Sequence, residues 1–295
     1  MRFWVIVGEG GGLNEVRNLK SGFDRLSEGE SRNKIIPMDD LCFTMGEKGD
    51  VRILVEGEEV PPPDVFMLWG HYNEVFDGIS HRLTSLGARS INDIDAKRVV
   101  CSKLETALLL EKEGIPQAKS MTVTVRTPVE KIVEYIGLPA VFKPSDGAQG
   151  AGVVLLHTEE EIRDYLKTLK EGDGKAVLAQ EYIATAKGKD TRVIVVDYKV
   201  AHTIQRIADD PDEFRSNVHL GGHRVPSTLD EDSVKLCEKV AEICGLRMCG
   251  IDLLETENGY VVGEVNCTPG VDPEFMKTDQ FKANILGLIA ETLRN

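Results

Sequence analysis

Short apolar runs separated by polar loops occupy the first third of the chain. Runs bounded by Gly, Pro and charged residues in this way are typical of strands. Pro61-Pro62-Pro63 stops one run sharply just before the next begins. The pattern predicts an α/β region with strands at residues 3–7, 34–38, 51–60 and 65–69.

Strand and helix periodicities alternate through the remaining two thirds. Apolar residues between positions 99 and 109 share one helical face, so a single helix is predicted over residues 95–113, ending at Gly114. Asp197-Tyr198-Lys199 joins two apolar runs and predicts an antiparallel hairpin. Thr228 and Glu231 have the spacing of a capping box at the start of a helix. The other predicted elements are strands at 120–125, 140–143, 153–157, 177–183, 191–196, 200–207, 249–254 and 260–265, and helices at 128–136, 159–169, 230–244 and 279–293.

Composition and charge narrow the class of protein. The 295 residues carry 35 Lys+Arg against 49 Asp+Glu, a net charge of −14. This acid excess argues against broad contact with nucleic acid or an anionic membrane, although it leaves room for a small basic pocket. No apolar run approaches the ~18 residues that a membrane helix needs, and the opening run stops at Gly8, too early for a signal peptide.

The six cysteines show no C-x-x-C spacing. Cys237 and Cys244 fall on one apolar helical stripe, which predicts that both are core residues. We therefore expect a reduced, cytoplasmic protein without a disulfide framework.

Two glycine-rich segments each follow a predicted strand. Gly8-Glu9-Gly10-Gly11-Gly12 lacks the spacing of a dinucleotide fingerprint, because Leu13 stands where the last glycine belongs; its role is left open. In the second segment, Lys143 precedes glycines at 147, 150 and 152. Glycines let backbone N–H groups approach phosphate oxygens, and the lysine supplies charge, although a hairpin tip with a surface lysine fits equally well. The Walker pattern is absent.

Three further polar segments are ambiguous in isolation. Residues 179–183 end a strand in a polar loop, which suits an adenine ring but also describes an ordinary strand. Phe214-Arg215-Ser216-Asn217, with Arg206, could bind phosphate or carboxylate, or could be a solvated loop. His219 and His223 flank two glycines, which disfavours a metal-binding helix.

Two isolated acids lie on the apolar strands predicted near the C-terminus. Asp252 lies on one strand; Glu264, followed two residues later by Asn266, lies on the next. A carboxylate on a buried strand is costly unless it is paired, protonated or bound to a cation. Two carboxylates and an amide oxygen suit a hard cation such as Mg²⁺.

The loop between these strands decides whether the two acids can share a cation. A two-residue Asn258-Gly259 turn sets Asp252 opposite Val265 and puts Glu264 on the other face. A three-residue loop that includes Glu257 sets Asp252 opposite Glu264, with the amide on the same face. A shared site needs an odd loop, so we predict the three-residue form with Gly259 in the left-handed region.

Five motifs in this order resemble the ATP-grasp superfamily, specifically the RimK-like carboxylate–amine ligases. The resemblance runs from about Lys103 to the C-terminal helix and thins before residue 95. The motifs are Ser102-Lys103-Leu104 with Gly114-Ile115-Pro116; Phe142-Lys143 with Gly147-Ala148-Gln149-Gly150-Ala151-Gly152-Val153; Gln180-Glu181-Tyr182-Ile183 with Asp190-Thr191-Arg192; Phe214-Arg215-Ser216-Asn217; and Gly250-Ile251-Asp252 with Glu264-Val265-Asn266-Cys267-Thr268-Pro269-Gly270.

The resemblance implies an α/β protein of three domains with ATP held between two antiparallel sheets. These are an N-terminal α/β domain at 1–94, a central lid domain at 95–184 and a C-terminal domain with the metal site at 185–295. The nucleotide-binding roles that it implies fall on Lys103, Lys143, Gly147, Gln149, Gly150, Glu181, Tyr182, Ile183, Asp190, Arg215, Ser216 and Asn217. Catalytic roles fall on Arg206, Arg215 and Asn217, and the ligands of two Mg²⁺ or Mn²⁺ ions are Asp252, Asn266 and a bridging Glu264.

The implied activity is ATP-dependent amide formation through an acyl phosphate. The partners are a small carboxylate and an amine, with glutamate as the favoured amino acid and a peptide or protein as one class of acceptor. A non-catalytic ATP-binding protein and a small-molecule kinase are the alternatives. The oligomeric state, including a homo-oligomer, is left open.

Overall fold

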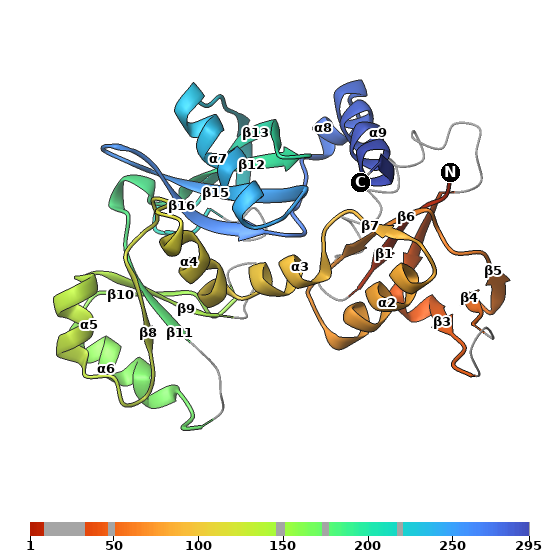
Figure 1. Cartoon of the computed structure of the whole chain (residues 1–295). Helices are drawn as coiled ribbons and strands as arrows, with labels where there is room; N and C mark the ends of the chain where they lie inside the picture. Colours follow the sequence, from red (N-terminus) through yellow and green to blue (C-terminus); the bar gives the residue numbers. More distant parts are fainter. Residues whose placement is uncertain (9–32, 47–50, 146–150, 173–176, 217–220, 295) are drawn as a thin grey trace.

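The computed structural model of the chain describes residues 1–8, 33–46, 51–145, 151–172, 177–216 and 221–294. Figure 1 shows three regions: an N-terminal sheet with its helices, a separate sheet carrying α5 and α6, and a C-terminal sheet beside α7 and α9. The mixed α/β architecture, with a four-stranded and a five-stranded antiparallel sheet in the central and C-terminal regions, confirms the predicted fold class.

The N-terminal region is built on a parallel sheet in the order β2-β1-β6-β7. The predicted strand at 51–60 is wrong in one respect, because it divides into two. Glu56 and Gly57 have positive φ values of 53° and 83° and turn the chain back on itself, which gives a small antiparallel sheet β3-β4-β5. The elements are β1 (Phe3–Val7), β2 (Lys34–Pro37), η1 (Met38–Asp40), β3 (Leu41–Phe43), β4 (Ile53–Val55), β5 (Glu58–Val60), β6 (Val65–Trp69), α2 (Glu74–Ser85) and β7 (Arg89–Ser90).

The single helix predicted over 95–113 is also wrong, because the chain breaks at Ser102. This residue is extended (φ −98°, ψ 111°) and divides α3 (Ile94–Cys101) from α4 (Lys103–Lys112). The Ser102 hydroxyl accepts a hydrogen bond from Glu105 N, so Ser102 caps α4. The break places Lys103 in the first turn of α4.

The central region is an antiparallel sheet in the order β10-β9-β11-β8 with two helices on one face. Alternate residues divide between the faces: Ala140 and Phe142 pack beneath the helices, whereas Val141 and Lys143 line a pocket on the other side. The elements are β8 (Ser120–Val123), α5 (Val129–Ile136), β9 (Ala140–Pro144), β10 (Val154–Leu156), α6 (Glu159–Thr168) and β11 (Val177–Glu181).

The C-terminal region is a five-stranded antiparallel sheet in the order β14-β13-β12-β15-β16. The predicted hairpin around residues 197–199 is present, with Asp197 and Tyr198 at positive φ and Lys199 already paired with Val196. The elements are η2 (Ala184–Ala186), β12 (Lys189–Val196), β13 (Lys199–Ala208), β14 (Gly222–Pro226), α7 (Glu231–Ile243), β15 (Met248–Thr256), β16 (Gly259–Asn266), α8 (Pro273–Met276) and α9 (Asp279–Arg294).

The predicted capping box at the start of α7 is wrong. Asp230 is the N-cap, and its carboxylate accepts from Ser233 N at 2.7 Å. The buried positions predicted for Cys237 and Cys244 are confirmed, and all six cysteines are free thiols. Among the described residues, no helix is both long enough and apolar enough to span a membrane.

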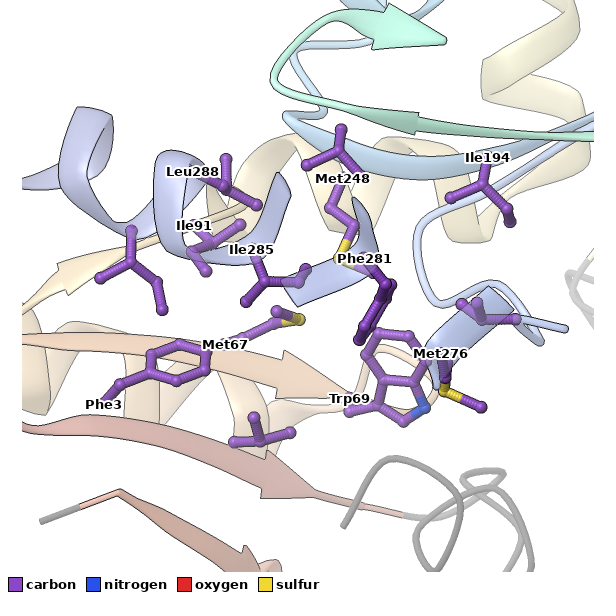
Figure 2. Close-up of a cluster of buried hydrophobic side chains, with 14 of the residues drawn as sticks. Phe3, Met67, Trp69, Ile91, Ile194, Met248, Met276, Phe281, Ile285 and Leu288 are labelled. Atoms are coloured by element: carbon purple, nitrogen blue, oxygen red, sulfur yellow. The ribbon is translucent and has the colours of Figure 1, made fainter. Parts of the chain in front are cut away.

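One apolar core joins the two ends of the chain. Figure 2 shows Phe3, Met67 and Trp69 of the parallel sheet facing Phe281 and Ile285 of α9. The same cluster continues into β12 and β15 through Ile194 and Met248. The N-terminal sheet is therefore packed against the C-terminal region, while the central sheet has a core of its own.

Candidate functional site

Most of the predicted site residues that the structure describes line one pocket between the central and the C-terminal antiparallel sheets. Six strands (β9, β11, β12, β13, β15 and β16) supply polar side chains to it, one or two from each, and α4 adds Lys103. The residues that line it are Lys103, Val141, Lys143, Pro144, Ala151, Val153, Gln180, Glu181, Tyr182, Ile183, Ala186, Lys189, Asp190, Arg206, Phe214, Arg215, Ser216, Asp252, Leu254, Gly263 and Glu264.

Lys143 stands on the pocket face of β9. Its Nζ donates a hydrogen bond to Gln180 Oε1 on β11 at 2.8 Å, and Gln180 Nε2 donates to Ser120 Oγ at 2.9 Å. Burial lowers the pKa of Lys143 to about 8, since the charged form is poorly solvated there; the Glu264 carboxylate opposes this shift. An anion in the pocket would stabilise the ammonium.

Lys103 approaches the same place from the first turn of α4. Its Nζ lies 3.3 Å from Glu264 Oε1. The helix end is tied to Ser145, whose carbonyl accepts from Lys103 N at 2.9 Å and whose hydroxyl accepts from Leu104 N at 3.2 Å. The break at Ser102 thus fixes this lysine beside the strand that leads into the second glycine-rich segment.

A chain of four charges on β12, β13 and β15 forms the charged floor of the pocket: Asp190, Arg206 and Asp252 line it, and Arg192 lies against Asp252. Arg206 donates from Nε to Asp190 Oδ1 at 2.7 Å and from Nη2 to Asp252 Oδ2 at 2.8 Å. Arg192 grips the other side of Asp252, with Nη2 2.9 Å from Oδ2 and a second hydrogen bond from Nε to Oδ1. The exposed fractions of Asp190, Arg192 and Asp252 are 8%, 7% and 5%, so these charges are compensated by one another and not by water.

The pKa values of Asp190 and Asp252 shift in opposite directions. Burial raises the pKa of Asp190, and the nearby Asp252 carboxylate raises it further, against the pull of Arg206. Burial also opposes ionisation of Asp252, but the flanking Arg192 and Arg206 hold its pKa below the usual value. Asp252 is therefore the firmly ionised member.

Asp252 and Glu264 lie opposite each other on β15 and β16, as predicted, but the register that pairs them is set in a different way. The turn contains two residues, Glu257 and Asn258, with Thr256 paired to Gly259, so the predicted three-residue loop is wrong. A β-bulge at Gly263 then shifts the register and sets Asp252 opposite Glu264. The positive φ predicted for Gly259 is confirmed at +109°.

The bulge needs glycine because space is short. A Cβ at Gly263 would lie 3.0 Å from Leu254 Cγ and 3.3 Å from the Asp252 carbonyl oxygen. Glycine therefore permits the close approach that sets the two acids side by side.

The oxygen donors at this edge fit a hard cation. Glu264 lines the pocket, and Asn266 follows on the same face of β16, paired with Gly250. The Asn266 amide nitrogen lies 3.5 Å from Asp252 Oδ2, and rotation of the amide would present its oxygen instead. Within the described ranges, no group of three or more His, Cys, Asp or Glu side chains gathers as a metal cluster, so such a cation would rely on the amide and on ligand oxygens.

The other predicted positions divide between the pocket and the undescribed segments. Glu181, Tyr182 and Ile183 lie at one wall, and Lys119 N donates to Glu181 Oε1 at 2.8 Å. Arg215 and Ser216 line the opposite part; Arg215 Nη2 pairs with Glu213 at 2.8 Å, and Ser216 Oγ donates to Asp190. The remaining predictions lie outside the described residues: Gly147, Gln149, Gly150, Asn217, His219 and most of the loop at 8–12.

Two residues of this site had no predicted role. Arg192 is the second cation on Asp252, and Gln180 orients Lys143. A signal for Arg192 exists in the sequence, because Asp190 and Arg192 are charged residues at alternate positions of one strand and so share one face. Gln180 stands in the same alternation with Leu178 on β11.

Comparison with known sequences places the chain among ligase relatives. A family model described as the RimK-like ATP-grasp domain matches residues 101–292. A probable alpha-L-glutamate ligase of Psychromonas ingrahamii is 31% identical over 294 residues, which cover 98% of this chain and 94% of the relative. A protein of the same name from Vibrio vulnificus is 29% identical and covers 95% of this chain and 93% of its own length.

Solved structures share the fold over the full chain. D-alanyl-alanine synthetase A from Vibrio cholerae matches with a TM-score of 0.73 at 17% identity, covering 100% of this chain and 99% of that one. The ATP-grasp ligase PsnB, complexed with a minimal precursor, matches with a TM-score of 0.70 at 19% identity, covering 99% and 100%. Family model, relatives and fold agree with the five motifs: the chain belongs to the RimK-like ATP-grasp family.

Proposed function

We propose that this protein is an ATP-dependent ligase that joins glutamate to an amine or carboxylate partner through an amide bond. The observation that carries the proposal is the meeting of three lysines, two arginines and four acids in one pocket between the central and C-terminal antiparallel sheets. The names of the relatives, probable alpha-L-glutamate ligases, support glutamate as one substrate.

In the proposed reaction, a substrate carboxylate attacks the γ-phosphate of ATP and forms an acyl phosphate and ADP. An amine then attacks the acyl carbon, the C–N bond forms, and inorganic phosphate leaves. No covalent bond to the enzyme is needed, so the protein contributes positioning and charge.

The lysines and the adenine wall would hold the nucleotide. Lys103 and Lys143 are close enough to Glu264 and Gln180 to be held in place, and each can turn an N–H toward a phosphate oxygen. Tyr182 and Ile183 offer an apolar wall with exposed backbone groups, which suits a purine. Asp190 would face the ribose.

Asp252, Glu264 and Asn266 would hold the metal, with Glu264 shared between two Mg²⁺ or Mn²⁺ ions. When bound, such ions offset charge that spreads over the transferred phosphoryl group. Arg206 is fixed by both Asp190 and Asp252, so its guanidinium is preorganised at the wall where the acyl phosphate would form. Arg215, with the neighbouring Asn217, would contact the same group.

The N-terminal region would contribute to the second substrate site. We divide the chain at residues 94 and 184 into the N-terminal, central and C-terminal ATP-grasp domains. A peptide or protein acceptor is included in the proposal, and we place the reaction in the cytoplasm.

Product analysis tests the proposal directly. Purified protein is incubated with ATP, Mg²⁺, isotope-labelled glutamate and a cell extract, and ADP and labelled products are followed by mass spectrometry. We expect a labelled amide with stoichiometric ADP. A phosphorylated acid formed without an amine would indicate a kinase. Tight ATP binding without ADP release across a panel of acids and amines would indicate a nucleotide-binding protein without ligase activity.

The metal assignment has its own test on the same hairpin. Glu264→Ala should abolish amide formation, because it removes the carboxylate proposed to bridge the ions. Glu257→Ala, in the exposed turn of the same hairpin, is the matched control and should keep the rate. Near-normal turnover of Glu264→Ala would contradict the assignment.

A further inference from the structure

Two thiols meet beside the proposed metal site. Cys101 ends α3 and Cys267 directly follows β16, yet their sulfur atoms lie 3.5 Å apart. Cys267 is 8% exposed and Cys101 is half-buried. These two cysteines flank functional positions, since Lys103 stands two residues after Cys101 and Asn266 immediately precedes Cys267.

A buried lysine completes the cluster. Lys97 is 2% exposed, and its Nζ donates to Gly70 O at 2.6 Å, to Thr268 Oγ1 at 2.9 Å and to Cys267 Sγ at 3.5 Å. These three hydrogen-bond partners include no carboxylate. A buried lysine is usually paired with an acid, and here the Cys267 sulfur atom is among its partners instead. The lysine fixes Cys267 opposite Cys101 and stabilises negative charge that develops on sulfur during a reaction.

The apolar cluster under α7 holds Cys237, Cys244 and Cys249 and extends to Cys267 and Cys101. Cys42 is exposed on β3. The pair at 101 and 267 combines proximity, a neighbouring cation and partial access. These are the conditions under which a thiol pair is readily oxidised.

We infer that Cys101 and Cys267 form a thiol-oxidation site, which a peroxide converts to a disulfide, and that this disulfide weakens binding of the nucleotide–metal complex. The second half of the inference rests on the proposed function, because it assumes that Asn266 and Lys103 serve the nucleotide and its metal. The first half stands on the geometry of the thiols alone.

The oxidation balances with hydrogen peroxide as the oxidant. One sulfur attacks a peroxide oxygen, the O–O bond breaks, and a sulfenic acid and one water form once the displaced hydroxide takes up the thiol proton. The second sulfur then attacks the sulfenic sulfur, the S–O bond breaks, and a second water leaves. Two thiols lose two electrons to the peroxide, and a thiol reductant reverses the reaction.

The new bond would strain the site through its neighbours. The sulfur atoms must close from 3.5 Å to about 2.05 Å. This closure pulls the end of α3 toward the end of β16, and with it the two flanking residues, Lys103 and Asn266. In a preorganised site, a displacement of about 1 Å can lower the reaction rate on the order of 100-fold. For binding of the nucleotide–metal complex, we expect at least about a tenfold loss in affinity.

The test uses the full-length protein and two independent readouts. The protein is treated with a low excess of hydrogen peroxide, and peptides are mapped by mass spectrometry without reduction. Affinity for Mg²⁺ with a non-hydrolysable ATP analogue is then measured by calorimetry before oxidation, after it, and after dithiothreitol. The variants are Cys101→Ala, which removes the pair, and Cys42→Ala, which removes only the exposed thiol.

We expect a peptide linked through Cys101 and Cys267, weakened binding that dithiothreitol restores, and the same behaviour in Cys42→Ala. Cys101→Ala should keep its affinity after peroxide. The inference is overturned if no such cross-link forms while Cys42 is oxidised, if the cross-linked protein binds as before, or if Cys101→Ala loses affinity equally. Neither readout needs amide formation, so a failure of the proposed ligase activity is seen separately.

Discussion

Arg192 offers the sharpest test of how the charged floor of the pocket is held together. The substitution Arg192→Met keeps a long apolar side chain but removes the guanidinium from Asp252. Both hydrogen bonds from Arg192 to that carboxylate are lost, and among the described residues only Arg206 Nη2, 2.8 Å from Oδ2, remains as a cationic donor. Asp252 is 5% exposed, so water cannot replace the missing partner.

The size of the effect follows from this burial. Removing one partner of a buried ion pair costs about 3–5 kcal/mol, because the other charge stays desolvated. Because the Arg206 contact remains, we expect the loss of folding stability in Arg192→Met to lie near the lower end of this range, at about 3 kcal/mol. The exposed pair of Arg126 with Glu171, whose side chains are 78% and 67% exposed, should contribute at most about 1 kcal/mol.

Urea unfolding followed by far-ultraviolet circular dichroism measures both effects. At neutral pH, the free energy of unfolding of Arg192→Met should be about 3 kcal/mol lower than that of the parent protein, and that of Arg126→Met should stay within about 1 kcal/mol of it. Adding Asp252→Asn to Arg192→Met should recover part of the loss, since it removes the stranded charge. An Arg192→Met protein as stable as the Arg126→Met control would refute the compensation argument.

Three further predictions concern individual contacts. Burial lowers the pKa of Lys143 to about 8, so ATP affinity should fall by up to about tenfold per pH unit above that value. The Lys143→Arg protein should bind ATP with the same affinity across this pH range. Calorimetry at several pH values checks both expectations. Gly263→Ala should cost about 1–3 kcal/mol in urea unfolding, because the new Cβ meets Leu254 Cγ at 3.0 Å; an unchanged midpoint would show that the bulge yields easily. Ser102→Ala should lower the free energy of unfolding by about 1 kcal/mol in thermal unfolding, because the N-cap of α4 is lost, and Ser102→Asn should keep the parent value.

Most strands could be predicted because their apolar residues alternate or run continuously between turn residues. The break between α3 and α4 could not, because apolar positions at helical spacing pass straight through Ser102. Serine is tolerated inside a helix, and only its hydrogen bonds to Glu105 and Ser145 reveal that it acts as a cap. The prediction of the start of α7 was wrong for a related reason: Thr228 and Asp230 are both residue types that favour the N-cap, and the helix begins after the second.

The β15–β16 hairpin shows what arguments from the number of loop residues can and cannot decide. Asp252 and Glu264 can face each other only if an odd number of residues is inserted between them, and that requirement was correct. An odd loop and a bulge satisfy it equally, so the sequence alone cannot distinguish them. Gly263 was the available signal, since an isolated glycine inside a strand often marks a bulge.

The charges of the site argue that cation and nucleotide enter it together. Asp190, Asp252, Arg192 and Arg206 cancel when all are ionised, and a bare divalent ion on Asp252 would place two further positive charges beside two guanidinium groups. In the proposed complex, the phosphates of ATP would supply the missing negative charge and would also compensate the lysines. Each ligand should therefore raise the affinity of the other by the same factor, as thermodynamic linkage requires. The excess of acid over base in the whole chain is not repeated in the pocket, whose lining carries five Lys and Arg against four Asp and Glu.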